Sequence, residues 1–99
     1  NGQVIAAQVA DSLLRIENVR MSIVVFQLTE DTVGISARST GELNVQVIME
    51  AFGGGGHQNV AGAQVKGGDV EDIKQQAIEI AKKYIEENDQ DESNLTAGR

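Results

Sequence analysis

Residues 52–63 of this chain read FGGGGHQNVAGA, and this segment decides both the fold and the candidate site. Four consecutive glycines are costly to order, because glycine loses more backbone entropy on folding than any other residue. A plain connection between a helix and a strand needs one glycine, or two. The surplus predicts a backbone that closely approaches a ligand, since successive N–H groups without Cβ atoms can converge on an anion. The alternative is a flexible hinge.

The residues on both sides of the glycines predict a short helix and a strand. Asn44 is a suitable N-cap, and helical spacing of apolar residues follows it as far as Phe52. Gly53 suits the position just after a helix, where a left-handed backbone is common. Residues 59–66 alternate as a strand that carries the small side chains of the segment on one face.

Farther out, the pattern predicts two more helices and two more strands. Residues 4–17 are an expected amphipathic helix, with an apolar face formed by Ile5, Val9, Leu13 and Ile16. Residues 19–26 and 32–39 are expected strands, and their short connection makes them an antiparallel hairpin. Residues 70–87 predict a long helix. The result is an α/β fold: a small single domain over residues 1–88, in the order α-β-β-α-β-α. We expect a mixed β-sheet flanked by helices, because the β-α-β part predicts a parallel crossover.

Length and composition exclude several classes of function. The 99 residues, 40% apolar and 23% charged, have the balance of one globular domain. A net charge of −7 argues against a general nucleic-acid binder and against a polybasic membrane surface. The absence of cysteine and the single histidine exclude thiolate and His-pair metal sites. No apolar run is long enough for a membrane span, and no signal peptide is recognisable, so we expect a cytoplasmic location.

Most of the acidity lies in the last third of the sequence. Residues 69–99 contain nine acids and four bases, a net charge of −5, whereas residues 1–68 contain six acids and four bases, a net charge of −2. Residues 89–99 are expected to form an acidic, disordered tail. The chain has no initiator methionine and a helical pattern begins almost at once, so we expect a fragment of a longer protein.

Two side chains stand out beside the glycines as candidates for phosphate binding. His57 follows the run directly, and its imidazole can donate to a phosphate oxygen or stack on a base. Arg38 shares a strand face with Ser36, near the carboxyl end of its strand, and a guanidinium suits bidentate phosphate binding. The alternatives are an exposed polar histidine and an arginine in a surface salt bridge. We expect no catalytic residue and no metal ligand, because no carboxylate pair or nucleophile with an oriented base is evident.

The glycine segment and its neighbours resemble one known family. The pattern GGGGHxxxAGA at 53–63 is similar to the signature of the DHHA1 domain, the C-terminal partner of DHH phosphoesterase domains. Residues 34–39, GISARS, resemble that family's strand end. Residues 44–49, NVQVIM, are most similar to the membrane-anchored cyclic-di-AMP phosphodiesterases of Gram-positive bacteria. One departure is visible, since many members have two alanines before the glycine where this chain has Val60 and Ala61. The larger Val60 either narrows the pocket or simply packs.

The resemblance implies a division of labour within a metal-dependent hydrolase. A DHH domain of the same chain would hold two manganese ions and activate water, whereas this domain would bind a cyclic dinucleotide or a short oligonucleotide. Carried over by motif, the substrate-binding residues are Arg38, Gly54, Gly55, Gly56 and His57, with Ser36 and Asn59 as weaker candidates. The fragment alone would hold no cofactor, be inactive and make no direct membrane contact, although the resemblance leaves open a parent protein that is membrane-anchored.

Two other functions stay open. One is a nucleic-acid-binding and association module like the C-terminal domain of alanyl-tRNA synthetases, which the net charge of −7 disfavours. The other is a homodimer built on the long last helix.

Overall fold

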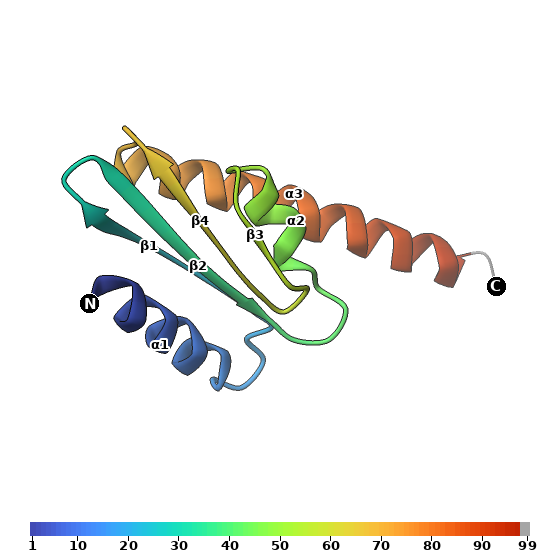
Figure 1. Cartoon of the computed structure of the whole chain (residues 1–99). Coiled ribbons are helices and arrows are strands. Elements are labelled where there is room, and N and C mark those ends of the chain that lie inside the picture. Colours follow the sequence, from blue (N-terminus) through green and yellow to red (C-terminus); the bar gives the residue numbers. More distant parts are fainter. Residues whose placement is uncertain (98–99) are drawn as a thin grey trace.

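The computed structural model describes the backbone of residues 1–97 and the side chains of residues 1–88. The expected order α-β-β-α-β-α is confirmed, with one additional short strand inside the glycine run (Figure 1). The elements are α1 (Gly2–Leu14), β1 (Met21–Thr29), β2 (Thr32–Ser39), α2 (Val45–Glu50), β3 (Gly55–Gly56), β4 (Val60–Lys66) and α3 (Val70–Ala97).

The sheet has the strand order β1-β2-β4-β3, and each neighbouring pair is antiparallel. The expected mixed sheet, with a parallel pair across α2, is therefore wrong. The physical reason is that the glycines themselves form β3, which runs in the same direction as β2. The chain then turns at residues 57–59, where the His57 N–H donates to the Val60 carbonyl at 2.7 Å. Strand β4 returns between β2 and β3, so the helix connects two strands that are not neighbours.

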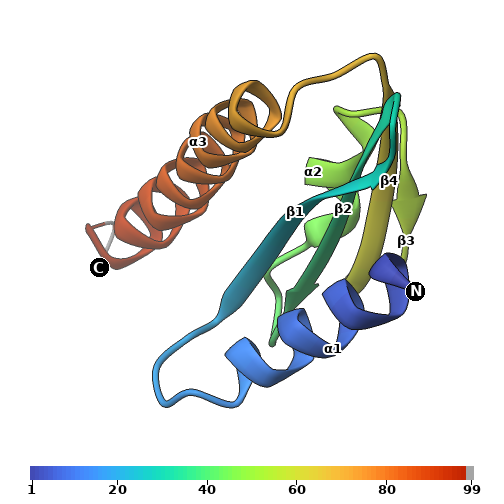
Figure 2. The ribbon, with the colours of Figure 1, turned by 90° about the vertical axis from the view of Figure 1, so that its left-hand side faces the viewer.

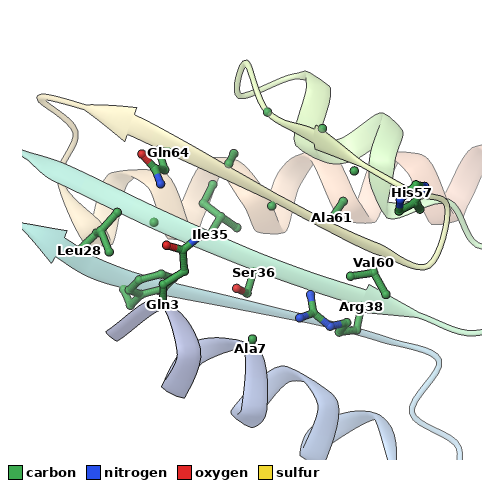
Figure 3. Close-up of a pocket in the computed structure, with 17 residues that line it drawn as sticks. Gln3, Ala7, Leu28, Ile35, Ser36, Arg38, His57, Val60, Ala61 and Gln64 are labelled. Atoms are coloured by element: carbon green, nitrogen blue, oxygen red, sulfur yellow. The ribbon is translucent and has the colours of Figure 1, made fainter. Parts of the chain in front are cut away.

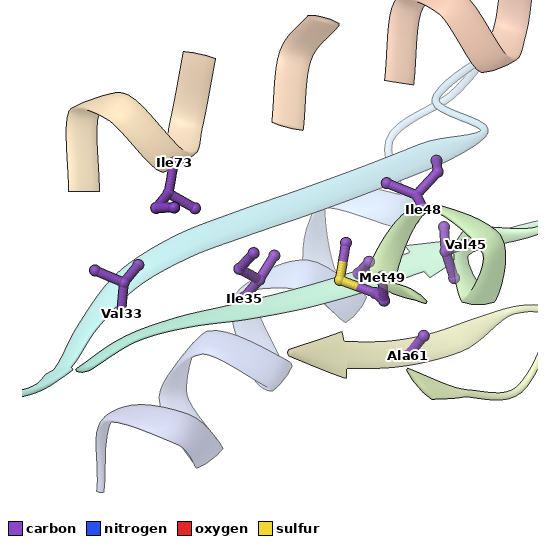
Figure 4. Close-up of a cluster of buried hydrophobic side chains, with 8 residues drawn as sticks. Val33, Ile35, Val45, Ile48, Met49, Ala61 and Ile73 are labelled. Carbon is purple, nitrogen blue, oxygen red and sulfur yellow. The ribbon is translucent and has the colours of Figure 1, made fainter. Parts of the chain in front are cut away.

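The sheet separates α1 from the other two helices (Figure 2). The hydrophobic core lies on the side of α2 and α3, where one face of β2 meets apolar residues of both helices (Figure 4). The core residues are Val33, Ile35, Ala37, Val45, Ile48, Met49, Ala61 and Ile73. The opposite face of β2 carries Gly34, Ser36 and Arg38, and only part of that face lies under α1.

Helix α1 buries a different face from the one expected. Ala6 and Ala10 are buried against the sheet, whereas the four large apolar residues of the expected face are exposed. The small side chains let α1 approach the sheet closely, and the Ser22 hydroxyl donates to the Ala10 carbonyl at 2.8 Å. Ile5, Val9 and Leu13 therefore lie on the flank of α1, whereas Ile16 follows the helix, which ends at Leu14 rather than near the expected residue 17.

Both ends of α2 are capped as the sequence indicates. The Asn44 side chain accepts a hydrogen bond from the Gln46 N–H at 2.9 Å, and Gly53 has a left-handed φ of +79°. The Tyr84 hydroxyl accepts from the Asn44 N–H at 2.7 Å, which joins α3 to the start of α2.

Helix α3 continues to Ala97, beyond the expected end near residue 87. Side chains beyond residue 88 lie outside the described residues, so the acidic tail at 89–99 stays a prediction, as does a homodimer through α3. Within the described part of the chain, no helix combines the length and apolar character that a membrane span requires.

Candidate functional site

A groove of about 550 Å³ lies on the α1 side of the sheet (Figure 3). Helix α1 packs over β1 and β2, which leaves β4 and β3 open on this face. Strands β2, β4 and β3 form the floor, and α1 forms one wall. The groove thus brings together six of the seven residues predicted to bind substrate: Ser36, Arg38, Gly54, Gly55, Gly56 and His57.

A row of small residues crosses the floor of the groove. Ser36 of β2 pairs with Gly62 of β4, and Gly62 pairs in turn with Gly55 of β3. Two of these three residues have no side chain, so a ligand can lie directly on the backbone of the sheet. Ser36 is buried in this floor and contributes its hydroxyl there.

The fold itself explains why three of the four consecutive positions are glycine. Gly53 ends α2 in the left-handed region. A Cβ on Gly54 would lie 2.6 Å from the Ala63 Cβ, and one on Gly56 would lie 2.6 Å from the Ala61 Cα. Gly56 also has a φ of +145°. The backbone conformation and the close approach of β4 therefore require these three glycines. The sequence analysis instead attributes the surplus of glycines to a ligand.

Gly55 is the exception in this run. A Cβ there would meet nothing within 4 Å, and its φ lies outside the left-handed region. The fold would accept a side chain at this position, so Gly55 is the one glycine of the run that the fold does not require. Its bare backbone on the groove floor is the feature that points to a ligand.

Arg38 forms the salt bridge that the sequence left as an alternative, and it also lines the groove. Its Nε donates to the Asp11 carboxylate at 2.7 Å, and its Nη1 donates to the Ala37 carbonyl at 2.9 Å. Its side chain is 12% exposed and lines the groove. Arg38 is thus the one formally charged residue among the described residues that line the groove, and its charge is partnered by Asp11 beside the groove.

The turn after β3 places His57 and Val60 at the groove but not Asn59. His57 is exposed at the end of the groove (Figure 3). Val60, paired with Arg38 across β2 and β4, is 49% exposed and lines the groove, so it faces the pocket rather than the core. Asn59 instead donates to the Ser39 hydroxyl at 2.9 Å and to the Gly41 carbonyl at 3.2 Å. Its side chain therefore holds the loop after β2.

The residues that line the groove and that the sequence interpretation missed include three with large side chains: Gln3, Phe26 and Gln64. Strand alternation carried a signal for Gln64, because it shares a face with Val60 and Gly62. Gln3 was missed because the sequence predicted that a different face of α1 packs on the sheet. Phe26 lies over Gly34, whose missing Cβ leaves room for the aromatic ring.

The groove does not fit a metal ion. One imidazole and no carboxylate line it, and no group of three potential metal ligands occurs among the described residues. Its side-chain donors (a guanidinium, a hydroxyl and an imidazole) instead suit an anion such as a phosphate.

Comparisons with known proteins agree with this chemistry. The family model described as the DHHA1 domain matches residues 2–87. The chain is 46% identical over 83 residues to the cyclic-di-AMP phosphodiesterase PdeA of Listeria monocytogenes, covering 84% of this chain and 13% of that protein. It is 49% identical over 84 residues to the cyclic-di-AMP phosphodiesterase GdpP of Geobacillus thermodenitrificans, covering 85% of this chain and 13% of that protein.

A solved structure gives the same fold. The crystal structure of an exopolyphosphatase-related protein from Bacteroides fragilis is similar with a TM-score of 0.68 and 30% identity. The match covers 76% of this chain and 22% of the other. In each comparison, this chain corresponds to a small part of a longer protein.

Proposed function

The chain belongs to the DHHA1 domain family, and on that premise we propose that it is the substrate-binding domain of a DHH-family phosphodiesterase. Its groove binds the phosphates of a cyclic dinucleotide or a short oligonucleotide. The observation that carries this proposal is Arg38, which lies beside a groove floor that includes bare glycine backbone and is the single formal charge among the described residues of the groove.

The groove offers one strong phosphate contact rather than an extended basic surface. Arg38 supplies charge-assisted hydrogen bonds, and the Gly55 backbone permits close approach of a phosphate. His57 adds a donor at one end, while Phe26 and Val60 provide apolar surface for a base. One cation suits a ligand with few phosphates, and the chain's net charge of −7 opposes a long nucleic acid.

The hydrolytic step belongs to a second domain in this proposal. The groove residues do not fit manganese, so the two-metal chemistry and the activated water come from a DHH domain of the same polypeptide. The role of this domain is to bind and orient the substrate. The identities of 46% and 49% to cyclic-di-AMP phosphodiesterases favour cyclic-di-AMP as the substrate over a longer oligonucleotide.

Calorimetric titration of the chain with cyclic-di-AMP tests this proposal. We expect weak but saturable binding, because one side of the site is missing, and no comparable binding of adenosine, which lacks phosphate. With manganese added, the chain alone should not hydrolyse cyclic-di-AMP. Equal binding of adenosine and cyclic-di-AMP would contradict phosphate recognition, and manganese-dependent hydrolysis would contradict the division of labour.

Val60 is expected to limit the width of the groove. Val60→Ala removes two methyl groups from a half-exposed position, so the free energy of unfolding should fall by less than about 1 kcal/mol. The affinity for cyclic-di-AMP should change by about threefold or less. Cyclic dinucleotides with bulkier adenine derivatives should gain affinity relative to cyclic-di-AMP. Competition binding with both ligands measures this ratio. An unchanged ratio would show that Val60 does not shape the pocket.

A further inference from the structure

Asp11 lies beside the groove, on α1, and the proposed function leaves it without a role. Its Oδ1 accepts a hydrogen bond from Arg38 Nε at 2.7 Å, although the two residues are 27 positions apart in the sequence. The Asp11 side chain is 53% exposed and that of Arg38 is 12% exposed. An ion pair with one partner this exposed contributes little to folding stability. Its significance lies in where it holds the guanidinium.

The hydrogen bonds of Arg38 are divided between the protein and the groove. An arginine side chain carries five N–H donors. Asp11 accepts the one on Nε, and the Ala37 carbonyl accepts one from Nη1 at 2.9 Å. The other three, on Nη1 and Nη2, have no protein acceptor among the described side chains and backbone. Because Arg38 lines the groove, these donors are available to a ligand there (Figure 3).

We propose that Asp11 is a positioning residue, which holds Arg38 in the orientation that presents its free donors to a phosphate. This inference rests on the proposed function of the groove. A long side chain that is already immobilised loses less entropy when it binds, so the complex is tighter. Asp11 acts through Arg38 and does not itself contact the ligand.

The negative charge of Asp11 and its hydrogen bond to Arg38 predict opposite effects on ligand affinity when Asp11 is removed. A carboxylate near a phosphate repels it and competes for the guanidinium, so a purely electrostatic role predicts tighter binding when Asp11 is removed. A positioning role predicts weaker binding. Asparagine separates the two effects, because its carbonyl oxygen can still accept from Arg38 Nε without the negative charge.

The experiment measures the Kd of cyclic-di-AMP for three variants of the chain. Asp11→Ala should weaken binding by roughly 2- to 10-fold, which corresponds to the cost of immobilising one long side chain. The Kd of Asp11→Asn should lie within about twofold of that of the unaltered chain, or be lower, because asparagine retains the oxygen that accepts from Arg38 Nε. Glu17→Ala, which removes an exposed carboxylate after α1, is the matched control and should leave the Kd unchanged. Thermal unfolding of each variant verifies that the fold is intact.

A second arm tests whether Asp11 acts through Arg38. In an Arg38→Ala background, Asp11→Ala should cause no further loss of affinity. The Arg38 Nε–H resonance should be protected from solvent exchange in the unaltered chain and in Asp11→Asn, and unprotected in Asp11→Ala. Binding by Asp11→Ala that equals or exceeds that of the unaltered chain would overturn the positioning role alone. An unaltered chain that does not bind cyclic-di-AMP would overturn the proposed function and this role with it.

Discussion

Gly54→Ala should lower the free energy of unfolding by about 1–3 kcal/mol, whereas Gly55→Ala should leave it unchanged or raise it slightly. A Cβ on Gly54 would lie 2.7 Å from the Ala63 Cα and also overlap the Gly62 carbonyl oxygen, both on the neighbouring strand. Neither group is the mobile end of a flexible side chain, so the backbone of β3 or β4 must shift. At Gly55 the new methyl group meets open space.

Thermal and urea unfolding of the two variants measure this difference. For a domain of this size, the expected loss at Gly54 lowers Tm by about 4–8 °C per kcal/mol. Gly55→Ala is the matched control for stability, but it should weaken ligand binding because its methyl group occupies the groove floor. Equal stability of the two variants would show that the close approach of β3 to β4 is not needed for the fold. Unaltered ligand binding by Gly55→Ala would exclude contact between the ligand and this floor.

Arg38→Ala should weaken binding of cyclic-di-AMP by about 10- to 150-fold, the range expected for a lost charge-assisted hydrogen bond of 1.5–3 kcal/mol. The loss is large because Arg38 carries the only formal charge among the described residues that line the groove. Arg38→Lys should recover part of the affinity, since it retains the charge but loses the planar fork that binds phosphate in a bidentate manner.

The matched control for this loss is Arg20→Ala, which removes one exposed positive charge outside the groove and should change affinity by less than about twofold at physiological salt. Similar losses for Arg20→Ala and Arg38→Ala would show that the chain's overall charge, rather than the groove, governs binding. Calorimetry at two salt concentrations measures both variants under the same conditions.

The element order was predictable from the sequence because local signals agree with the tertiary fold. Asn44 and Gly53 bracket α2, and alternation identifies β2 and β4. The antiparallel pairing of β1 with β2 was predicted from their short connection and is confirmed. The antiparallel pairing of β4 with β2 was not predictable, because four glycines carry no alternation that would reveal β3. Without β3, the helix α2 would connect β2 directly to β4, and such a connection predicts a parallel crossover. The orientation of α1 was also missed, since Ala6 and Ala10 are buried by close approach to the sheet while the larger apolar residues are exposed.

The candidate site followed from the sequence to a similar extent. The resemblance named six residues that line the groove and one, Asn59, whose side chain holds a loop instead. Gln3 and Phe26 enter the groove only through packing between elements, which no local pattern encodes. The pairing of Asp11 with Arg38 likewise depends on where α1 crosses the sheet.

The most direct test of the central claim is an NMR titration of the isotope-labelled chain with cyclic-di-AMP. We predict that the amide signals of residues 54–57 and of Arg38 shift first and saturate together, while those of the exposed α1 flank and of α3 stay in place. The same signals should respond to the linear dinucleotide product. Shifts scattered over the surface, or confined to residues beyond 88, would contradict the account, because the groove on the α1 side of the sheet would then not be the binding site.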